Sequence, residues 1–330
     1  MSGQPSTRFA ATLLAALLTL ATTAGAQAQD ANASDPPLVL TATQATWSIA
    51  NALLADTPVE VVNVPEDGRE FAVLRSYIER RKARLAPIFA SATAVVALTN
   101  ALPADPLFRY ARAVNVRAVN IDAALPVTYD TPGVALTDMP HSNVAWYERS
   151  EPGAAESTVA PYFWLSLSNT MRMADIVAGD LARLFPAYAT TIESNADRFR
   201  QTMLDTRNDF QSRLLEAGDD TVFALTGDFV YLTNDLGLFV DGYFIQQDIR
   251  WTDTNLSDLT AHLRSRDIRV VIHKWMPNDA IQAAVSAAGA QLVVLETGDP
   301  GRADGDMLAV DGLQRLLVDN LEKITTALQR

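Results

Sequence analysis

The stretch of sequence that decides the fold is AYATTIESNADRFRQTMLDTRNDFQSRLL, residues 187–215. It contains no Gly or Pro and is charged along its length, which favours one unbroken helix with a solvated surface. A second helical pattern precedes it from Ser168 and has its own apolar face, and Pro186 separates the two. A long charged helix placed between two halves of a chain predicts a rigid spine and not a flexible hinge.

On both sides of this spine, short apolar runs alternate with helical patterns. Strands are expected at 39–41, 59–64, 93–98, 116–120, 222–225, 238–243, 269–272 and 291–295. Helices are expected at 44–55, 70–85, 106–112, 229–235, 255–266, 278–288 and 307–328. Strands separated by helices predict parallel sheets with right-handed crossovers. The expected fold class is α/β, with two small parallel-sheet βα lobes joined by a long rigid spine helix.

The spine also sets the expected domain bounds. Residues 29–167 form the N-terminal lobe, residues 168–216 the spine helices and residues 217–330 the C-terminal lobe. Residues 125–161 are rich in Pro, Gly, Thr and Ser and show no sustained period. We expect a long loop there, and a loop of that length inside a compact protein is usually functional or mobile.

Residues 1–28 are predicted to be a cleaved signal peptide. Arg8 is the only charge before Asp30, residues 9–24 are apolar, and small residues follow. The apolar stretch is shorter than the roughly 20 residues that a spanning helix needs. The chain contains 0 cysteines, so it has no disulfide and no cysteine that could carry a lipid. These features predict an exported, periplasmic protein that is not membrane-embedded.

The charge and the motifs exclude other classes of protein. The formal net charge is -13 and no basic stripe is present, so nucleic acid is not an expected partner. The sequence has no cysteine nucleophile and no match to the G-x-S-x-G, G-x-G-x-x-G, Walker or H-E-x-x-H motifs. We therefore expect a binding protein and not an enzyme.

Candidate ligand-binding residues follow the expected strands, because open parallel sheets bind ligands outside the carboxyl ends of their strands. Asp228, Gln247, His273 and Asp299 occupy such positions, and His141 lies in the long loop. Each of the four also suits an ordinary strand-to-helix loop, where polar residues and helix caps are common. The positions alone do not separate these two interpretations.

Three stretches resemble the periplasmic metal-binding proteins of zinc and manganese ABC importers. LVLTATQATWSIANALLADTPVEVVNVPEDGREF, residues 38–71, is similar to the opening strand, helix and strand of that family, which lead to a D-P-H-E-Y loop. PYFWLSLSN, residues 161–169, is similar to its D-P-H-x-W-L-x-P segment before the spine, and DGLQRLLVDNLEKITTAL, residues 311–328, to its closing helix. The resemblance implies a ligand cleft between the lobes, zinc or manganese as the transported ligand, and a permease and an ATPase as partners.

The metal ligands that the family uses do not all carry over. Arg69 stands at the first histidine of the family pattern and Tyr162 at the second. The third ligand aligns near Gln247, and the fourth, an acid, aligns with Asp299. Arginine has no lone pair and carries a positive charge, so it cannot coordinate a divalent cation.

Three functions remain open at this point. The first is a metal-importer component whose ligands lie elsewhere, among His141, His273, Asp228 and Asp299. The second is an importer component, or a protein that shares its fold, that binds a non-metal or complexed-metal ligand through Arg69, Tyr162 and Gln247. The third is an enzyme or scaffold that reuses the fold.

A specific hypothesis concerns Arg69. Its guanidinium is expected in the cleft, in the place of the metal, facing Asp299 or the phenol of Tyr162. A cation carried by the chain would satisfy a buried carboxylate without a metal ion.

Overall fold

The structure is a computed structural model that describes residues 36–128, 132–147 and 158–329. The predicted signal peptide, residues 1–28, lies outside the described residues. In the part of the chain that is described, no helix combines the length and the apolar character needed to cross a membrane.

The N-terminal lobe is built on a four-stranded parallel sheet in the order β2-β1-β3-β4. Its strands are β1 (Leu38–Thr41), β2 (Glu60–Asn63), β3 (Ala92–Ala97) and β4 (Val119–Asp122). The helices between them are α1 (Gln44–Leu54), α2 (Phe71–Arg80), α3 (Lys82–Ser91) and α4 (Leu107–Val114). All four residues of β1 are buried, which is typical of a strand covered on both faces of a parallel sheet.

The C-terminal lobe repeats this topology. Its sheet has the order β6-β5-β7-β8, again parallel, with β5 (Thr221–Ala224), β6 (Phe239–Tyr243), β7 (Val270–His273) and β8 (Gln291–Val294). The helices are α7 (Val230–Leu236), α8 (Asp253–Ser265) and α9 (Asp279–Ala287). In both lobes the first strand lies beside the third. The connections that follow these two strands therefore leave toward opposite edges of the sheet.

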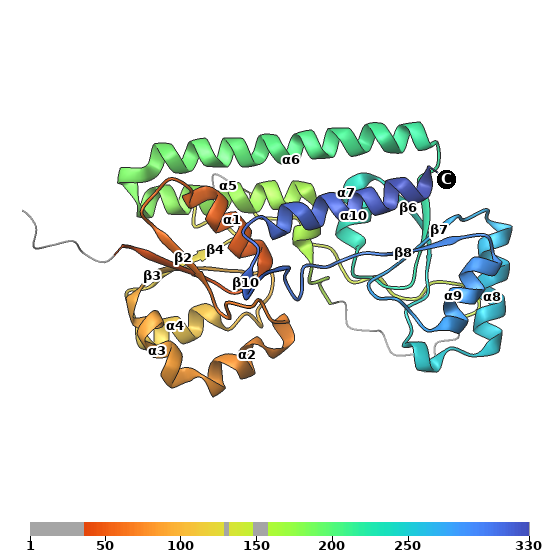
Figure 1. The fold of residues 1–330 in the computed structure, drawn as a ribbon, viewed down its shortest axis with the longest axis horizontal. Helices are drawn as coiled ribbons and strands as arrows, with labels where there is room; N and C mark the ends of the chain where they lie inside the picture. The colour runs from red at the N-terminus through yellow and green to blue at the C-terminus, as the bar shows by residue number, and fades with distance from the viewer. Residues whose placement is uncertain (1–35, 129–131, 148–157, 330) are drawn as a thin grey trace, which may run out of the picture. The chain divides into compact units, whose positions relative to one another are not determined.

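Two helices join the lobes. α5 (Leu167–Leu184) ends before Pro186, and α6 (Ala189–Ala217) runs without a break for 29 residues, or about 43 Å at the usual rise. Figure 1 shows α6 running from above the N-terminal sheet to the near side of the C-terminal lobe. It ends at Gly218, whose φ of 68° is the left-handed conformation that favours glycine at a helix end. The predicted α/β fold, with two parallel-sheet lobes and one spine helix, is confirmed.

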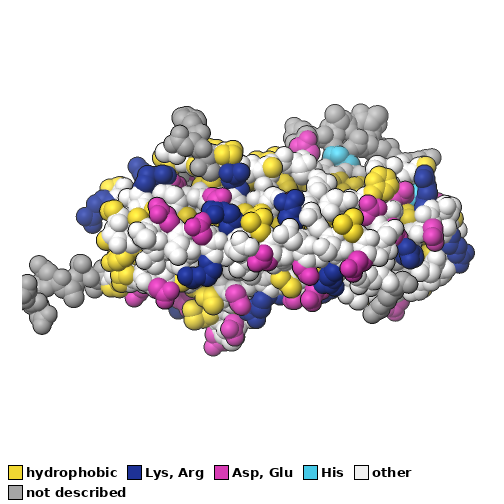
Figure 2. Space-filling view, turned by 90° about the horizontal axis from the view of Figure 1, so that it is seen from above, with side chains coloured by type: hydrophobic (Ala, Val, Ile, Leu, Met, Phe, Trp, Pro, Cys, Tyr) yellow, Lys and Arg dark blue, Asp and Glu magenta, His cyan; other side chains and the backbone are white. Residues whose placement is uncertain are grey.

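The outer face of α6 is charged in both signs, as the sequence pattern predicted. Glu193, Asp197 and Arg198 are exposed there, and Figure 2 shows acidic and basic side chains interspersed over this face of the molecule. The opposite face is apolar and packs on α1, α5 and α10 (Gly312–Leu328). Packing on three helices fixes the spine from one side and leaves its other side solvated.

Two expected helices differ from the structure. The single helix expected over 70–85 is two helices, α2 and α3, because the chain turns at Arg81, whose φ is -112° and ψ 13°. The turn brings Ile78 and Phe89 into the same buried cluster. The helix expected from 307 begins at Gly312, because residues 303–308 form a hairpin of β9 (Ala303–Asp304) and β10 (Met307–Leu308). Its two-residue turn contains Gly305 at a φ of 65°, as such turns require.

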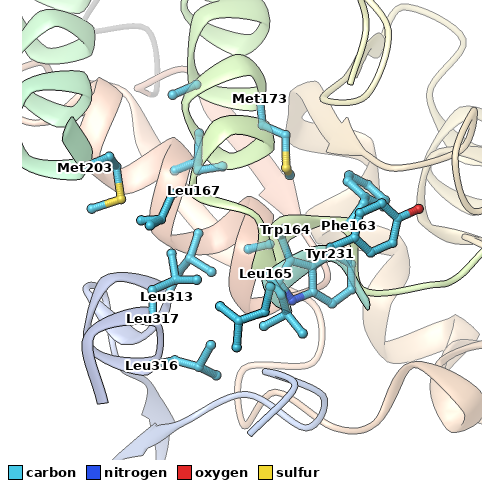
Figure 3. Close-up of a cluster of buried hydrophobic side chains, with 14 of the residues drawn as sticks. Phe163, Trp164, Leu165, Leu167, Met173, Met203, Tyr231, Leu313, Leu316 and Leu317 are labelled. Carbon is cyan, nitrogen blue, oxygen red and sulfur yellow. The ribbon is translucent and has the colours of Figure 1, made fainter. Parts of the chain in front are cut away.

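A large apolar cluster lies where the lobes and the spine meet. Figure 3 shows the aromatic and aliphatic side chains of the segment Phe163–Leu167 packed against residues of α5, α6, α7 and α10. Trp164 is 2% exposed and is the largest fully buried side chain. Tyr162 comes directly before this anchored segment, so the packing determines where its phenol lies.

Candidate functional site

The main crevice near the candidate residues lies at the carboxyl ends of β5, β6 and β7 and has a volume of about 530 Å³. The loops after these three strands line it, together with residues 139–142 and Tyr147 of the long loop. Connections that leave β5 and β7 in opposite directions open a crevice at this point of a parallel sheet, which is where such folds bind ligands. Three of the predicted site residues line it: His141, Asp228 and Gln247.

Asp228 is held by an ion pair inside this crevice. Its Oδ2 lies 2.7 Å from Nζ of Lys274, which follows β7, and it also accepts a hydrogen bond from the hydroxyl of Thr226. The Asp228 side chain is only 9% exposed, whereas that of Lys274 is 33% exposed. The ammonium also lies 5.3 Å from the ring centre of Trp275. A nearly buried carboxylate needs such a partner, because desolvating an unpaired charge is costly.

His273 ends β7 and is 2% exposed. Burial lowers the pKa of its imidazole to about 4, and the charge of Lys274 contributes to the same shift. The ring is therefore neutral near pH 7. Its Nδ1 has no hydrogen-bond partner among the described residues, and its ring centre lies 4.3 Å from that of Trp275. His273 belongs to the wall beneath the crevice and not to its lining.

Asp299 and Tyr162 form a second group, where the two lobes meet. Oδ1 of Asp299 accepts a hydrogen bond of 2.7 Å from the backbone N–H of Phe71, the first residue of α2. Burial raises the pKa of Tyr162 to about 12, and the charges of Asp299 and Asp228 add to the shift. Burial also raises the pKa of Asp299, against the effect of the Phe71 N–H. The phenol therefore stays protonated, and Asp299 serves as the acceptor at a helix N-terminus.

The space at this second group is small. The cavity that Asp299 shares with the loops after β1 and β2 has a volume of about 10 Å³. A cavity of that size holds at most a single water molecule. The crevice on the C-terminal lobe is therefore the larger of the two spaces that the predicted site residues line.

Arg69 does not make the contact with Asp299 or Tyr162 that the hypothesis expected. Its guanidinium binds Asp67, with Nη2 2.8 Å from Oδ2, and lies 5.4 Å from the ring centre of Tyr77. Its side chain is 47% exposed, and it pairs with neither Asp299 nor Tyr162 in the described structure. The physical reason is local: Asp67 is two residues away in the same exposed loop, so this pair forms without the cost of burying a charge.

The proposed metal donors do not converge. Within residues 36–128, 132–147 and 158–329, no group of three or more His, Cys, Asp or Glu side chains is placed to hold a metal ion. His141 and Asp228 line the crevice, His273 lies beneath it, and Asp299 belongs to the second group. The donor role of these four residues stays a prediction.

One important residue of the crevice was not among the predicted site residues. Lys274 directly follows His273, so its place after β7 was visible in the sequence. Its partner, Asp228, is 46 residues away, and only the order of the strands brings the two together.

The comparisons with known proteins agree with this fold. Among solved structures, a mutant of FpvC from Pseudomonas aeruginosa has a TM-score of 0.66 at 20% identity, covering 88% of this chain and 99% of that one. A periplasmic metal-binding protein from Candidatus Liberibacter asiaticus has a TM-score of 0.59 at 18% identity, covering 88% and 99%. A zinc-bound deletion mutant of ZnuA has a TM-score of 0.60 at 17% identity, covering 90% and 99%. At these identities the likeness shows the fold.

The family is shown by a different comparison. No curated protein matches the sequence significantly. The model of the family "ZnuA: Zinc-uptake complex component A periplasmic" matches residues 89–327, which is well over half of the chain. The match spans the last two strands of the N-terminal sheet, both spine helices, the whole C-terminal sheet and nearly all of α10. The chain therefore belongs to the family of the periplasmic component A of zinc-uptake complexes, the solute-binding proteins of metal importers.

Proposed function

We propose that this protein carries a divalent metal ion through the periplasm to an ABC permease driven by an ATPase. The family match carries the proposal, since it covers both spine helices and nearly all of the C-terminal lobe. The structures of FpvC with Ni²⁺ and with Mn²⁺, and that of the ZnuA mutant with zinc, support a divalent ion as the cargo. Cleavage of residues 1–28 as a signal peptide would release the protein into the periplasm.

The crevice on the C-terminal lobe is the proposed cargo site. Asp228 supplies a carboxylate there, and His141 and Gln247 supply further N and O donors. Imidazole and carboxylate groups both bind zinc and manganese. The alternative, a non-metal or complexed-metal ligand held by Arg69 and Tyr162, is not favoured, because Arg69 is already paired with Asp67 in an exposed loop.

The test has two parts. Native mass spectrometry of the protein taken from the periplasm without a chelator should detect a divalent metal ion on the chain. A strain that lacks the protein should take up less zinc or manganese from metal-poor medium, and the wild-type gene should restore uptake. The variant Asp228→Asn should restore it less well than a matched control, Glu193→Gln, on the exposed face of α6. Metal-free protein together with unchanged uptake of both metals would refute the proposal.

A further inference from the structure

We propose that Lys274 is a cation carried by the chain that competes with the metal ion for Asp228 and so weakens the binding of free divalent metal. This inference rests on the proposed function, because it concerns the same crevice. It assigns Lys274 as a residue that sets the strength of cargo binding.

The position of the ion pair is the first argument. Asp228 follows β5 and Lys274 follows β7, and these two strands are neighbours at the centre of the C-terminal sheet. Both side chains therefore lie at the point where the crevice opens between diverging connections. A charge at this point acts on any ligand that enters the crevice.

The chemistry of the pair is the second argument. The ammonium of Lys274 has three donors and no lone pair, so it can only take the place of a metal ion and never bind one. With Nζ 2.7 Å from Oδ2, it occupies a carboxylate that a divalent ion would need. Metal can bind Asp228 fully only after the ammonium has moved away, and the free energy of the broken pair reduces the affinity.

The charges of Asp228 and Asp299 are the third argument, because Lys274 offsets both. The charge of Asp228 reaches the phenol of Tyr162, and that of Lys274 reaches Asp299, although burial dominates the pKa of both affected groups. The ammonium therefore lies within the field of two acids that come from separate loops. One positive charge in this place offsets the negative potential that would otherwise attract a divalent cation.

The structure also leaves Lys274 free to move. One third of its side chain is exposed, and it lines a crevice of about 530 Å³. The face of Trp275 offers the ammonium a second contact, and four rotatable bonds allow it to turn. Lys274 is therefore a displaceable competitor and not a fixed block.

The experiment measures zinc binding to metal-free full-length mature protein by calorimetry. We compare the wild type with Lys274→Met, which removes the charged Nζ and keeps an unbranched side chain, and with Lys274→Arg, which keeps the charge. Lys274→Met should bind zinc at least about tenfold more tightly, a change equal to about 1.4 kcal/mol. Lys274→Arg should stay close to the wild type. Adding Asp228→Asn to Lys274→Met should remove the gain, because the competition is for that carboxylate.

Each outcome supports or overturns a stated proposal. Zinc affinity in Lys274→Met equal to that of the wild type, with metal bound by both, overturns the role of Lys274 and leaves metal transport standing. Absence of zinc, manganese and nickel binding in every variant overturns both proposals. A gain that persists in the double variant also overturns the competition for Asp228. Urea unfolding checks that each variant is folded, and Lys274→Gln replaces Lys274→Met if the latter is not.

Discussion

The burial, protonation and contacts of single residues in this protein depend on what surrounds them after folding. His273 and Lys274 are neighbours in sequence, yet the imidazole is buried and neutral while the ammonium reaches the crevice and pairs with Asp228. The difference follows from position, since His273 is the last residue of the buried strand β7, whereas Lys274 lies just past its end, within reach of Asp228 after β5. Their consequences for stability can be measured separately.

The burial of His273 predicts a dependence of stability on pH. The imidazole has a pKa of about 4 in the folded protein, below its usual 6.5, so the unfolded chain takes up a proton first as the pH falls. This residue therefore costs no stability above about pH 7, and it lowers the free energy of unfolding progressively between pH 6.5 and 4, by about 2 kcal/mol at pH 5.

The measurement is urea unfolding of the wild type and of His273→Phe at several pH values from 7.5 to 4.5. The variant removes the imidazole, whereas the carboxyl groups of the protein contribute equally to both curves. The wild type should lose about 2 kcal/mol more than the variant between pH 7.5 and pH 5. Parallel curves for the two proteins would contradict the prediction.

Asp299 makes a different contribution as the acceptor at the start of α2. Removing its carboxylate in Asp299→Ala leaves the N–H of Phe71 without its partner and removes a negative charge from a helix N-terminus. We expect a loss of about 1–2 kcal/mol in the free energy of unfolding. Asp299→Asn, which keeps an acceptor oxygen, should lose less. Equal losses in the two variants would show that the hydrogen bond is not the cause.

At the scale of elements, the spine depends on one face of α6. Its buried side chains include Ile192, Phe199 and Phe210, whereas Arg198 on the other face is exposed. An isolated charged helix is only marginally stable in water, so most of its stability in the protein comes from packing this face. The helix is thus a spine because α1, α5 and α10 hold it.

Phe199→Ala tests this packing. Phe199 is 5% exposed in the main apolar cluster, so its truncation should lower the free energy of unfolding by about 3–5 kcal/mol. Arg198→Ala, its neighbour on the solvated face, should change stability by less than about 0.5 kcal/mol. Chemical denaturation of both variants gives the comparison. A similar effect from the two substitutions would show that packing does not hold the spine.

At the scale of the whole described chain, the C-terminal segment returns to the first helix. The side chain of Gln44 in α1 donates to the carbonyl of Ala309 and accepts from the N–H of Arg302, each at 2.9 Å. The indole of Trp47 donates to the carbonyl of Leu308 at 3.2 Å. A Cβ on Gly312 would lie 2.5 Å from the Gln44 amide, so only glycine permits this approach. The domain bounds expected from the sequence stay a prediction, and these contacts cross them.

Gln44→Leu should therefore destabilise the protein as a whole. The substitution removes the partner of the buried carbonyl of Ala309 and of the half-buried N–H of Arg302, at a cost of about 2 kcal/mol together. Asn51→Leu, on the same helix, is the matched control, since among the described residues the Asn51 side chain bonds the carbonyl of Trp47 alone, one turn earlier. A thermal melt in which Gln44→Leu is as stable as the control would refute this account.

The sequence by itself determined the elements and their order. Short apolar runs separated by helical patterns predict parallel sheets, because periodicity and helix breakers act over a few residues. The unbroken pattern of residues 187–215 predicted α6, and the positions after the strands identified the loops that line the crevice. The family match covers the second of the three stretches that carried the resemblance, residues 161–169, and nearly all of the third, residues 311–328.

Only the tertiary structure decided which side chains meet. Arg69 and Lys274 are both cations in strand-to-helix loops, and the partner of Arg69, Asp67, lies two residues away, whereas the partner of Lys274 lies on a distant loop. The strand order places β7 beside β5 and brings Lys274 to Asp228, whereas Arg69 satisfies its charge on its own loop. Pairing across a sheet depends on contacts between distant parts of the chain, which sequence periodicity does not encode. For that reason the single positions suggested for a metal in the sequence do not say which donors come together, and their role stays a prediction.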